Sequence, residues 1–210
     1  YAQEQFMKNI DFQLNHKIIY NSIDDKYMIK KNFQKLCNNN ISNSFRIGFI
    51  GRYSSIKRLP LFLEICFELN KYSNDTLKFY IQSDIKSNML LKLINEIKSK
   101  KNIHNNLNFH LIGNQNDPLE FYKSIDILIS TSLSESFGLT CIEALAMKKR
   151  LYTINSSSIE SLFGSVDFNI KEKKIEKISK LLINLFEKEY KYPNLERFTE
   201  SRMLKEYAKH

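Results

Sequence analysis

The 210-residue sequence is 42% hydrophobic and 26% charged, which is ordinary for a soluble globular protein. No apolar run approaches the length that spans a bilayer, no signal peptide is visible, and the start at Tyr1 indicates a fragment or a processed chain. The net charge of +9 favours phosphates, an anionic lipid surface or nucleic acid as partners. A biased genome composition, which could also produce a chain rich in Lys, Asn and Ile, is the alternative explanation of this charge. The basic residues form no stripe with aromatic residues, so we expect no nucleic-acid partner.

Residues 1–44 are predicted to form an interdomain segment and linker. Residues 1–14 place apolar side chains at helical spacing, and the apolar run KIIY at 17–20 indicates a strand. Residues 27–37 are weakly helical. The Asn- and Ser-rich stretch at 38–44 indicates a linker, after which the compact domain is expected to begin.

Residues 45–190 are predicted to form one α/β domain in which strands alternate with helices. The expected strands cover 45–50, 77–81, 107–112, 125–130, 151–154 and 166–170. The expected helices cover 59–69, 87–97, a short segment capped by Asp117, 139–147, 159–163 and 175–190, which Pro193 is expected to break. Apolar strands in this alternation predict a Rossmann-like doubly wound parallel sheet of about six strands, whose ligands bind beyond the carboxyl ends of the strands. Residues 191–210 should add a C-terminal helix at 199–209.

The most informative stretch follows the fourth expected strand and has the sequence SESFGLTCIEALA. Glu143 is the one charged residue of an apolar helix, where a carboxylate is costly unless it is satisfied. Glu135 precedes that helix, at a distance of roughly 12 Å if the chain between them were helical throughout. Phe137 and Gly138 lie between the carboxylates, where a helix start should present free amides to an anion. This pattern suits a nucleoside diphosphate-sugar, with hydroxyls at both ends and phosphates between them.

The stretch ESFGLTCIEALA resembles the donor-site signature E-x7-E of retaining glycosyltransferases with the GT-B fold, the glycosyl transferases group 1 or family-four class. The resemblance runs from about residue 17 to the C-terminus. It implies that Glu135 contacts the donor sugar and that Glu143 contacts the ribose hydroxyls. The substrate-binding residues implied for this stretch are Glu135, Ser136, Phe137, Gly138, Leu139 and Glu143. A buried helix preceded by a solvated carboxylate remains the alternative.

The loop GRYSSIKRL after the first expected strand resembles the family's G-R-x4-K arrangement, in which the two basic residues hold the donor diphosphate. Glycosyl transfer leaves a diphosphate with new negative charge, and many GT-B enzymes stabilise it without a metal. The resemblance therefore implies that Arg52, Lys57 and Glu135 are catalytic, with Gly51 and Gly113 as further donor contacts at strand ends. Two solvated loop cations are the alternative.

Several other residues are assigned less specific roles. Glu160 matches the family's G-G-x-x-E motif although serines replace both glycines, and a helix-capping role is an equal alternative. His110 is expected in the core or the sheet, and the four histidines show no metal-binding spacing. Cys66 and Cys141 are predicted to be reduced core residues, and no metal site is expected.

The resemblance implies the donor-binding half of a hexosyltransferase of polysaccharide or lipopolysaccharide biosynthesis. It would take a UDP- or GDP-sugar, need no cofactor, and serve a glycan or lipid-linked acceptor. The acceptor site would lie on an N-terminal domain, for which too few residues precede residue 45, so this chain alone should be inactive. A cytoplasmic location is expected, with peripheral contact to the anionic inner face of the membrane as a further option. The alternatives are a stand-alone nucleotide-sugar-binding module, a GT-B sugar-nucleotide epimerase and a basic nucleic-acid-binding protein.

Overall fold

The computed structural model describes residues 20–28, 44–113 and 118–208. Several predicted segments lie wholly or mostly outside these ranges, namely 1–14, 17–20, 27–37 and 38–44. Tyr20, the described end of the strand expected at 17–20, belongs to no strand.

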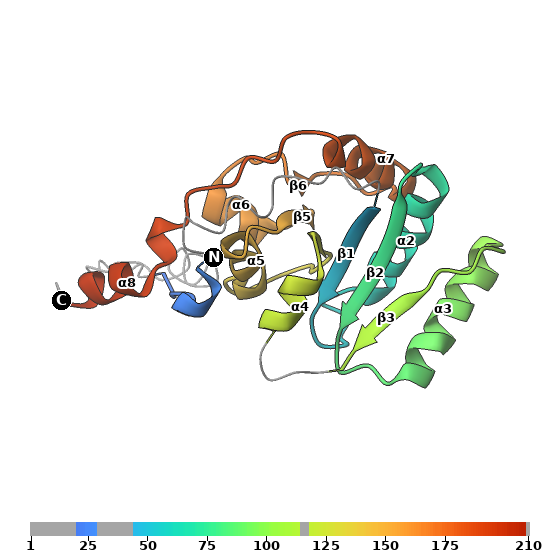
Figure 1. The fold of residues 1–210 in the computed structure, drawn as a ribbon, viewed down its shortest axis with the longest axis horizontal. Coiled ribbons are helices and arrows are strands. Elements are labelled where there is room, and N and C mark those ends of the chain that lie inside the picture. Colours follow the sequence, from blue (N-terminus) through green and yellow to red (C-terminus); the bar gives the residue numbers. More distant parts are fainter. Residues whose placement is uncertain (1–19, 29–43, 114–117, 209–210) are drawn as a thin grey trace, which may run out of the picture.

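The described elements alternate as the sequence predicts (Figure 1). The strands are β1 (Ser44–Ile50), β2 (Thr76–Gln82), β3 (Phe109–Ile112), β4 (Ile127–Ser130), β5 (Arg150–Ile154) and β6 (Asn169–Ile170). The helices are α2 (Leu59–Tyr72), α3 (Ser87–Lys101), α4 (Leu119–Ser124), α5 (Leu139–Ala146), α6 (Ser157–Phe163), α7 (Ile175–Phe186) and α8 (Glu200–Tyr207). Two short 3₁₀ helices are also described: η1 (Asp25–Tyr27) precedes β1, and η3 (Glu196–Phe198) lies between α7 and α8.

The six strands form one parallel sheet in the order β3-β2-β1-β4-β5-β6. The chain builds outward from β1 through β2 to β3, then returns to the other side of β1 with β4. This order confirms the predicted Rossmann-like doubly wound fold. The reversal between β1 and β4 is the switch point at which such sheets leave a crevice beyond their carboxyl ends.

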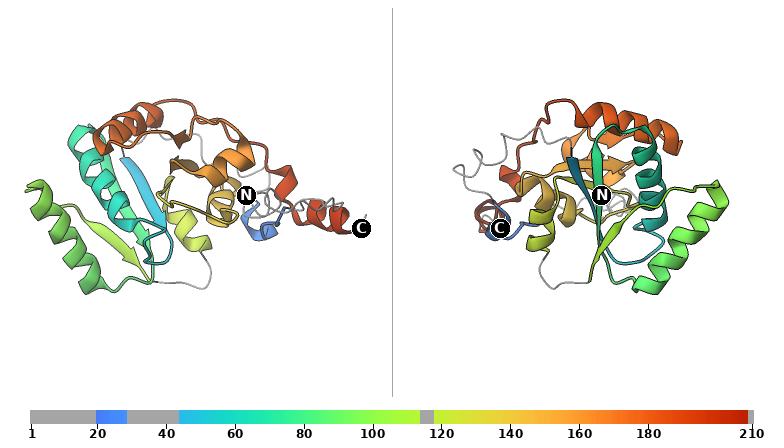
Figure 2. Two further views of the ribbon diagram at one scale, coloured as in Figure 1. Left: turned by 180° about the vertical axis from the view of Figure 1, so that it is seen from behind. Right: turned by 45° about the vertical axis from the view of Figure 1, so that its right-hand side comes forward.

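Helices cover both faces of the sheet, with α2, α3 and α7 on one face and α4 and α5 on the other (Figure 2). On the first face Phe49 of β1 packs on Phe62 of α2, with ring centroids 5.3 Å apart. On the second face Gly48 faces α4, where an added Cβ would come within 2.8 Å of Phe121 and Ile125. The absence of a side chain at Gly48 therefore lets α4 approach the centre of the sheet closely.

Three helices end earlier than the sequence predicts, and α8 does so at Tyr207 instead of residue 209. Helix α7 ends at Phe186 instead of residue 190, so Pro193 does not terminate it. The chain leaves the helix because the hydroxyl of Tyr190 exchanges two hydrogen bonds of 3.1 Å with the backbone of Leu151 in β5. Helix α5 ends at Ala146, one residue earlier than expected.

The sixth strand is shorter than predicted, and the start of α4 is only partly described. Strand β6 is two residues long because the amide of Asn169 donates to the carbonyl of Val166, which turns the chain before the strand begins. The N-cap position of α4 is Pro118, whose side chain accepts no hydrogen bond. Asp117 lies outside the described residues, so its role as a cap stays a prediction.

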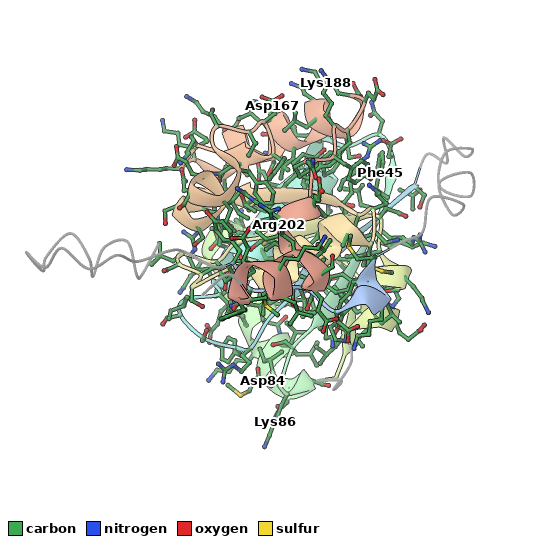
Figure 3. The ribbon with its side chains drawn as sticks, turned by 90° about the vertical axis from the view of Figure 1, so that its left-hand side faces the viewer. Phe45, Asp84, Lys86, Asp167, Lys188 and Arg202 are labelled. Carbon is green, nitrogen blue, oxygen red and sulfur yellow. The ribbon has the colours of Figure 1, made fainter. Side chains whose placement is uncertain are left out.

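Segments from both ends of the chain pack together beside the sheet. The amide of Ile23 donates to the carbonyl of Phe198 over 3.0 Å. Helix α8 then extends away from the body in Figures 1 and 2. Figure 3 looks onto α8 from its Arg202 side, with Asp84 marking the carboxyl edge of the sheet and Phe45 the opposite edge. Within the described ranges, no helix has the length and apolar character needed to cross a bilayer.

Candidate functional site

The loops after β1 and β4 meet at the switch point of the sheet. The amide of Leu133 donates to the carbonyl of Ile56 over 2.8 Å, which joins the two loops directly. The Thr131 hydroxyl lies 2.8 Å from the carbonyl of Lys57 and 3.1 Å from that of Arg58. Backbone contacts therefore fix the position of each loop relative to the other.

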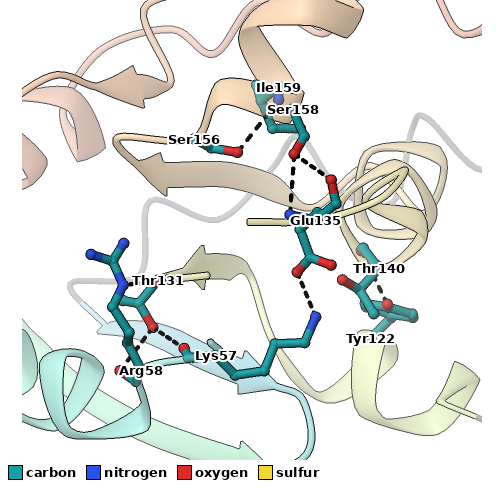
Figure 4. A network of polar contacts seen from close by, with 9 residues as sticks. All are labelled: Lys57, Arg58, Tyr122, Thr131, Glu135, Thr140, Ser156, Ser158 and Ile159. Atoms are coloured by element: carbon teal, nitrogen blue, oxygen red, sulfur yellow. Dashed lines mark hydrogen bonds and ion pairs between the residues drawn. The ribbon is translucent and has the colours of Figure 1, made fainter. Parts of the chain in front are cut away.

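These loops bring Lys57 and Glu135 together as an ion pair (Figure 4). The Lys57 Nζ lies 2.5 Å from the Glu135 Oε1, and their side chains are only 23% and 14% exposed. The sequence placed both residues at one edge of the sheet, and the structure shows them in direct contact. A cation at this position would lie within reach of an anion bound at the crevice.

The start of α5 lies immediately after Glu135 in the chain. Gly138 is buried and adopts a left-handed conformation, with φ 77° and ψ 39°, which favours glycine. Its carbonyl accepts the amides of Cys141 and Ile142, so the amides ahead of them have no partner within the helix. Such a helix start favours negative charge. Because α5 begins only at Leu139, the estimate of 12 Å for a helical path from Glu135 does not apply.

Glu143, on α5, has a buried hydrogen-bond partner. The Tyr122 hydroxyl lies 2.8 Å from the Glu143 Oε2 and 3.1 Å from the carbonyl of Thr140. Burial raises the pKa of Tyr122 well above its ordinary value, and the negative charge of Glu143 raises it further. The phenol therefore stays protonated and donates to the carboxylate, which satisfies a charge on an otherwise apolar helix.

Arg52 occupies a different place from Lys57 in the same loop. Its side chain is exposed, and its positive charge acts on Asp84, which follows β2. A hydrogen bond of 2.5 Å from the amide of Tyr53 lowers the pKa of Asp84, and the charge of Arg52 acts in the same direction. The amide of Gly51 donates to the carbonyl of Gln82 over 3.0 Å. Arg52 and Gly51 thus lie on the β2 side of the crevice.

The other predicted substrate-binding residues are more dispersed. Ser136 and Leu139 are exposed on either side of Phe137 and Gly138. Gly113 is exposed at the end of β3, which lies two strands away from β1 in the sheet. The structure therefore does not bring Gly113 next to the Lys57–Glu135 pair.

Phe137 packs outside the sheet, against residues from both ends of the chain. Its ring centroid lies 5.7 Å from that of Phe198 and 6.3 Å from that of Tyr20. The Arg197 guanidinium lies over the rings of Tyr20 and Phe198, 5.1 and 4.8 Å from their centroids. This aromatic contact holds one side of the loop that carries Glu135.

Sequence reasoning missed two residues that organise the site. Arg58, left-handed at φ 51°, donates to the carbonyls of Thr131 and Ile154 over 2.5 and 3.1 Å. It thereby ties the ends of β4 and β5 to the loop after β1, and burial lowers its pKa. Ser158, buried in α6, contacts the backbone of Glu135. The available signals were the third cation of the loop, directly after Lys57, and the third serine of the run SSSIE, directly after the two serines that replace the family's glycines.

The structure decides two interpretations that the sequence left open. Glu160 does not complete a capping box with the N-cap residue Ser156, because the side chain of Asn169 accepts the amide of Ser156 over 3.0 Å. The Ser156 hydroxyl caps α6 by accepting the amide of Ile159 over 3.4 Å. Glu160 instead forms an ion pair with Lys171 on the surface. His110 lies in β3, so of its two expected places, the core or the sheet, the structure shows the sheet, and its side chain is exposed.

Among the described residues, the cysteines and the potential metal ligands add nothing further to the site. Cys66 and Cys141 are free thiols buried in helices, as predicted. In the part of the chain that the structure describes, no group of three or more His, Cys, Asp or Glu side chains could hold a metal ion.

The strand order defines a Rossmann-like α/β domain, and Lys57 and Glu135 form an ion pair at its switch point. The family model for glycosyl transferases group 1 matches residues 30–210, and the chain belongs to that family. A comparison with curated protein sequences finds none that matches.

Solved glycosyltransferase structures with the GT-B architecture share this fold. A mutant of S. aureus TarM, in complex with fondaparinux, alpha-GlcNAc-glycerol and UDP, is 18% identical with a TM-score of 0.66, over 99% of this chain and 42% of that one. Anabaena Alr3699/HepE, in complex with UDP and glucose, is 17% identical with a TM-score of 0.67, over 92% of this chain and 56% of that one. The pneumococcal O-GlcNAc transferase GtfA, in complex with UDP and GlcNAc, is 18% identical with a TM-score of 0.65, over 99% of this chain and 42% of that one. At these identities the likeness shows the fold, and this chain spans 42% to 56% of the length of these relatives.

Proposed function

We propose that this chain is the donor-binding domain of a retaining glycosyltransferase that uses a UDP- or GDP-sugar. The observation that carries the proposal is the ion pair of Lys57 and Glu135, partly buried at the switch point beside the start of α5. Membership of the glycosyl transferases group 1 family supports transfer of a sugar. The similar structures of TarM, HepE and GtfA contain UDP, which favours UDP over GDP here.

The proposed roles follow the charges along the crevice. Lys57 and Arg52, with the amides at the start of α5, would stabilise the diphosphate as the anomeric carbon–oxygen bond breaks and the oxygen keeps the electron pair. Glu135 would contact the sugar, and Glu143, held by Tyr122, would accept the ribose hydroxyls. Gly51, Gly113, Ser136, Phe137, Gly138 and Leu139 would line the donor site. Fixed cations make a metal or other cofactor unnecessary in this scheme.

The complete protein would add an N-terminal domain that binds a glycan or lipid-linked acceptor. Proximity and orientation then come from closing two domains around both substrates, so the 210-residue chain alone should not transfer a hexosyl unit at a useful rate. The net charge of +9 is compatible with a cytoplasmic enzyme that touches an anionic membrane surface. Efficient sugar transfer by the purified 210-residue chain would contradict the proposal that a second domain is needed.

The proposal is tested by calorimetric titration of wild type and single variants with bare nucleotides and nucleotide-sugars. Glu143→Gln should weaken the binding of bare UDP or GDP, because an amide has one acceptor oxygen where the carboxylate has two. Glu135→Gln should leave bare nucleotide affinity intact or raise it, since Lys57 is released, while weakening the nucleotide-sugar. Arg52→Ala and Lys57→Ala should each weaken both ligands, and added salt should weaken them further. If the wild type binds no nucleotide, the proposed function is wrong.

A further inference from the structure

The backbone of Glu135 is held by a single buried side chain. The Ser158 hydroxyl donates to the carbonyl of Glu135 over 2.7 Å and accepts its amide over 3.2 Å (Figure 4). Ser158 is fully buried, although it lies on α6 and Glu135 lies on the loop after β4. A hydroxyl is one donor and also an acceptor, so this one group satisfies both polar atoms of the Glu135 backbone.

Helix α6 is itself fixed by a buried polar network. The side chain of Asn169 accepts the amide of Ser156 over 3.0 Å and donates to its carbonyl over 2.8 Å. The Thr153 hydroxyl donates to the same Asn169 side chain over 2.9 Å. Thr153, Ser156 and Asn169 are all buried, so the start of α6 is locked to β5 and β6. Ser158 therefore fixes the loop after β4 relative to the sheet.

We propose that Ser158 is a positioning residue for the donor sugar, acting through the backbone of Glu135. Residues 131–138 form no helix or strand, so regular backbone hydrogen bonding does not set the direction of the Glu135 side chain. The two hydrogen bonds from Ser158 set the direction of the Glu135 side chain, so that its carboxylate points toward Lys57 and the sugar end of the crevice. The inference rests on the proposed function, and it predicts an effect on the sugar that is separate from the effect on the nucleotide.

Four variants isolate the hydroxyl. Ser158→Ala removes it, while Ser158→Thr and Ser158→Val have the same shape and differ only in keeping or losing it. Ser179→Ala is the matched control, because Ser179 is also fully buried in a helix and its hydroxyl has no hydrogen-bond partner among the described residues. Each protein is titrated with UDP, GDP and the nucleotide-sugar that the wild type binds best among UDP-glucose, UDP-GlcNAc and GDP-mannose. Amide hydrogen exchange at Glu135 is measured by NMR.

Ser158→Ala should lower nucleotide-sugar affinity by about three- to tenfold beyond any change in bare nucleotide affinity, and Glu135 amide exchange should become faster. Ser158→Thr should bind the nucleotide-sugar better than Ser158→Val, and Ser179→Ala should match the wild type. Any of three results would overturn this inference while leaving the proposed function intact. The first is unchanged exchange of the Glu135 amide in Ser158→Ala, and the second is an equal loss of affinity for nucleotide and nucleotide-sugar in that variant. The third is equal nucleotide-sugar affinity of Ser158→Thr and Ser158→Val. A wild type that binds neither ligand would overturn the proposed function and the inference with it.

Discussion

The ion pair between Lys57 and Glu135 should make a measurable contribution to folding stability. Replacing Lys57 by Met or Glu135 by Gln removes one charge and leaves the other without its partner in a partly buried site. Replacing both removes the pair without leaving that charge alone. The double-mutant cycle therefore reports the coupling energy of the pair, which is the difference between the double change and the sum of the single changes.

The structure sets the expected size of this coupling. Two unit charges 2.5 Å apart attract by roughly 2 kcal/mol in bulk water and roughly 7 kcal/mol at an effective dielectric constant of about 20. The loss of hydration offsets much of this attraction. With side chains 23% and 14% exposed, the pair lies between surface pairs and fully buried ones, so we expect a coupling of about 1–3 kcal/mol.

Urea unfolding of the four proteins, compared at equal m-values, measures the coupling. The exposed pair of Glu120 and Lys123 on α4 is the matched control, with a nitrogen–oxygen distance of 2.7 Å and an expected coupling of about 0.5 kcal/mol or less. Salt at about 1 M should reduce the control coupling more than that of Lys57 and Glu135. A coupling at Lys57 and Glu135 no larger than the control would refute the argument from burial.

Three further predictions each concern a single residue. Tyr122→Phe should lower the free energy of unfolding by about 1.5–3 kcal/mol, because it removes a hydrogen bond to the charged Glu143; an unchanged urea midpoint would contradict this. Partial burial alone would raise the pKa of Asp126, but hydrogen bonds from Arg46 outweigh it and lower the pKa. Asp126→Asn should therefore destabilise the protein at pH 7, and its difference from the wild type in urea unfolding should shrink as the pH falls below about 4; a constant difference would argue against the pair. Burial and the charge of Glu135 raise the pKa of Cys141 to about 12, so iodoacetamide at pH 8 should label its peptide only after unfolding, as mass spectrometry would show.

Much of the architecture was predictable because local patterns and chain order carry it. Apolar strands that alternate with helices specify a parallel sheet, and the doubly wound order places the loops after β1 and β4 together. The approach of Lys57 to Glu135 follows from that order. Gly138 was a further local signal, since a glycine before an apolar helix marked the left-handed turn that starts α5.

The contacts that refine the site were not predictable from local patterns. Ser158 and Arg58 act on backbone atoms that are remote in the sequence, so no spacing rule identifies them. The end of α7 depends on the hydroxyl of Tyr190 reaching the backbone of Leu151. In each case a tertiary hydrogen bond decides the local structure, whereas helical periodicity and motif matching describe neighbours along the chain.

The aromatic contact of Phe137 has a practical consequence for work on this domain. Tyr20 and Phe198 both lie outside residues 45–190, yet their rings pack on the loop that carries Glu135. A version trimmed to residues 45–190 would retain all six strands, apart from Ser44 at the start of β1, but would lose the aromatic contacts to that loop. Such a truncation would keep the fold while weakening the ligand site, so binding studies should retain residues 20–28 and 195–198.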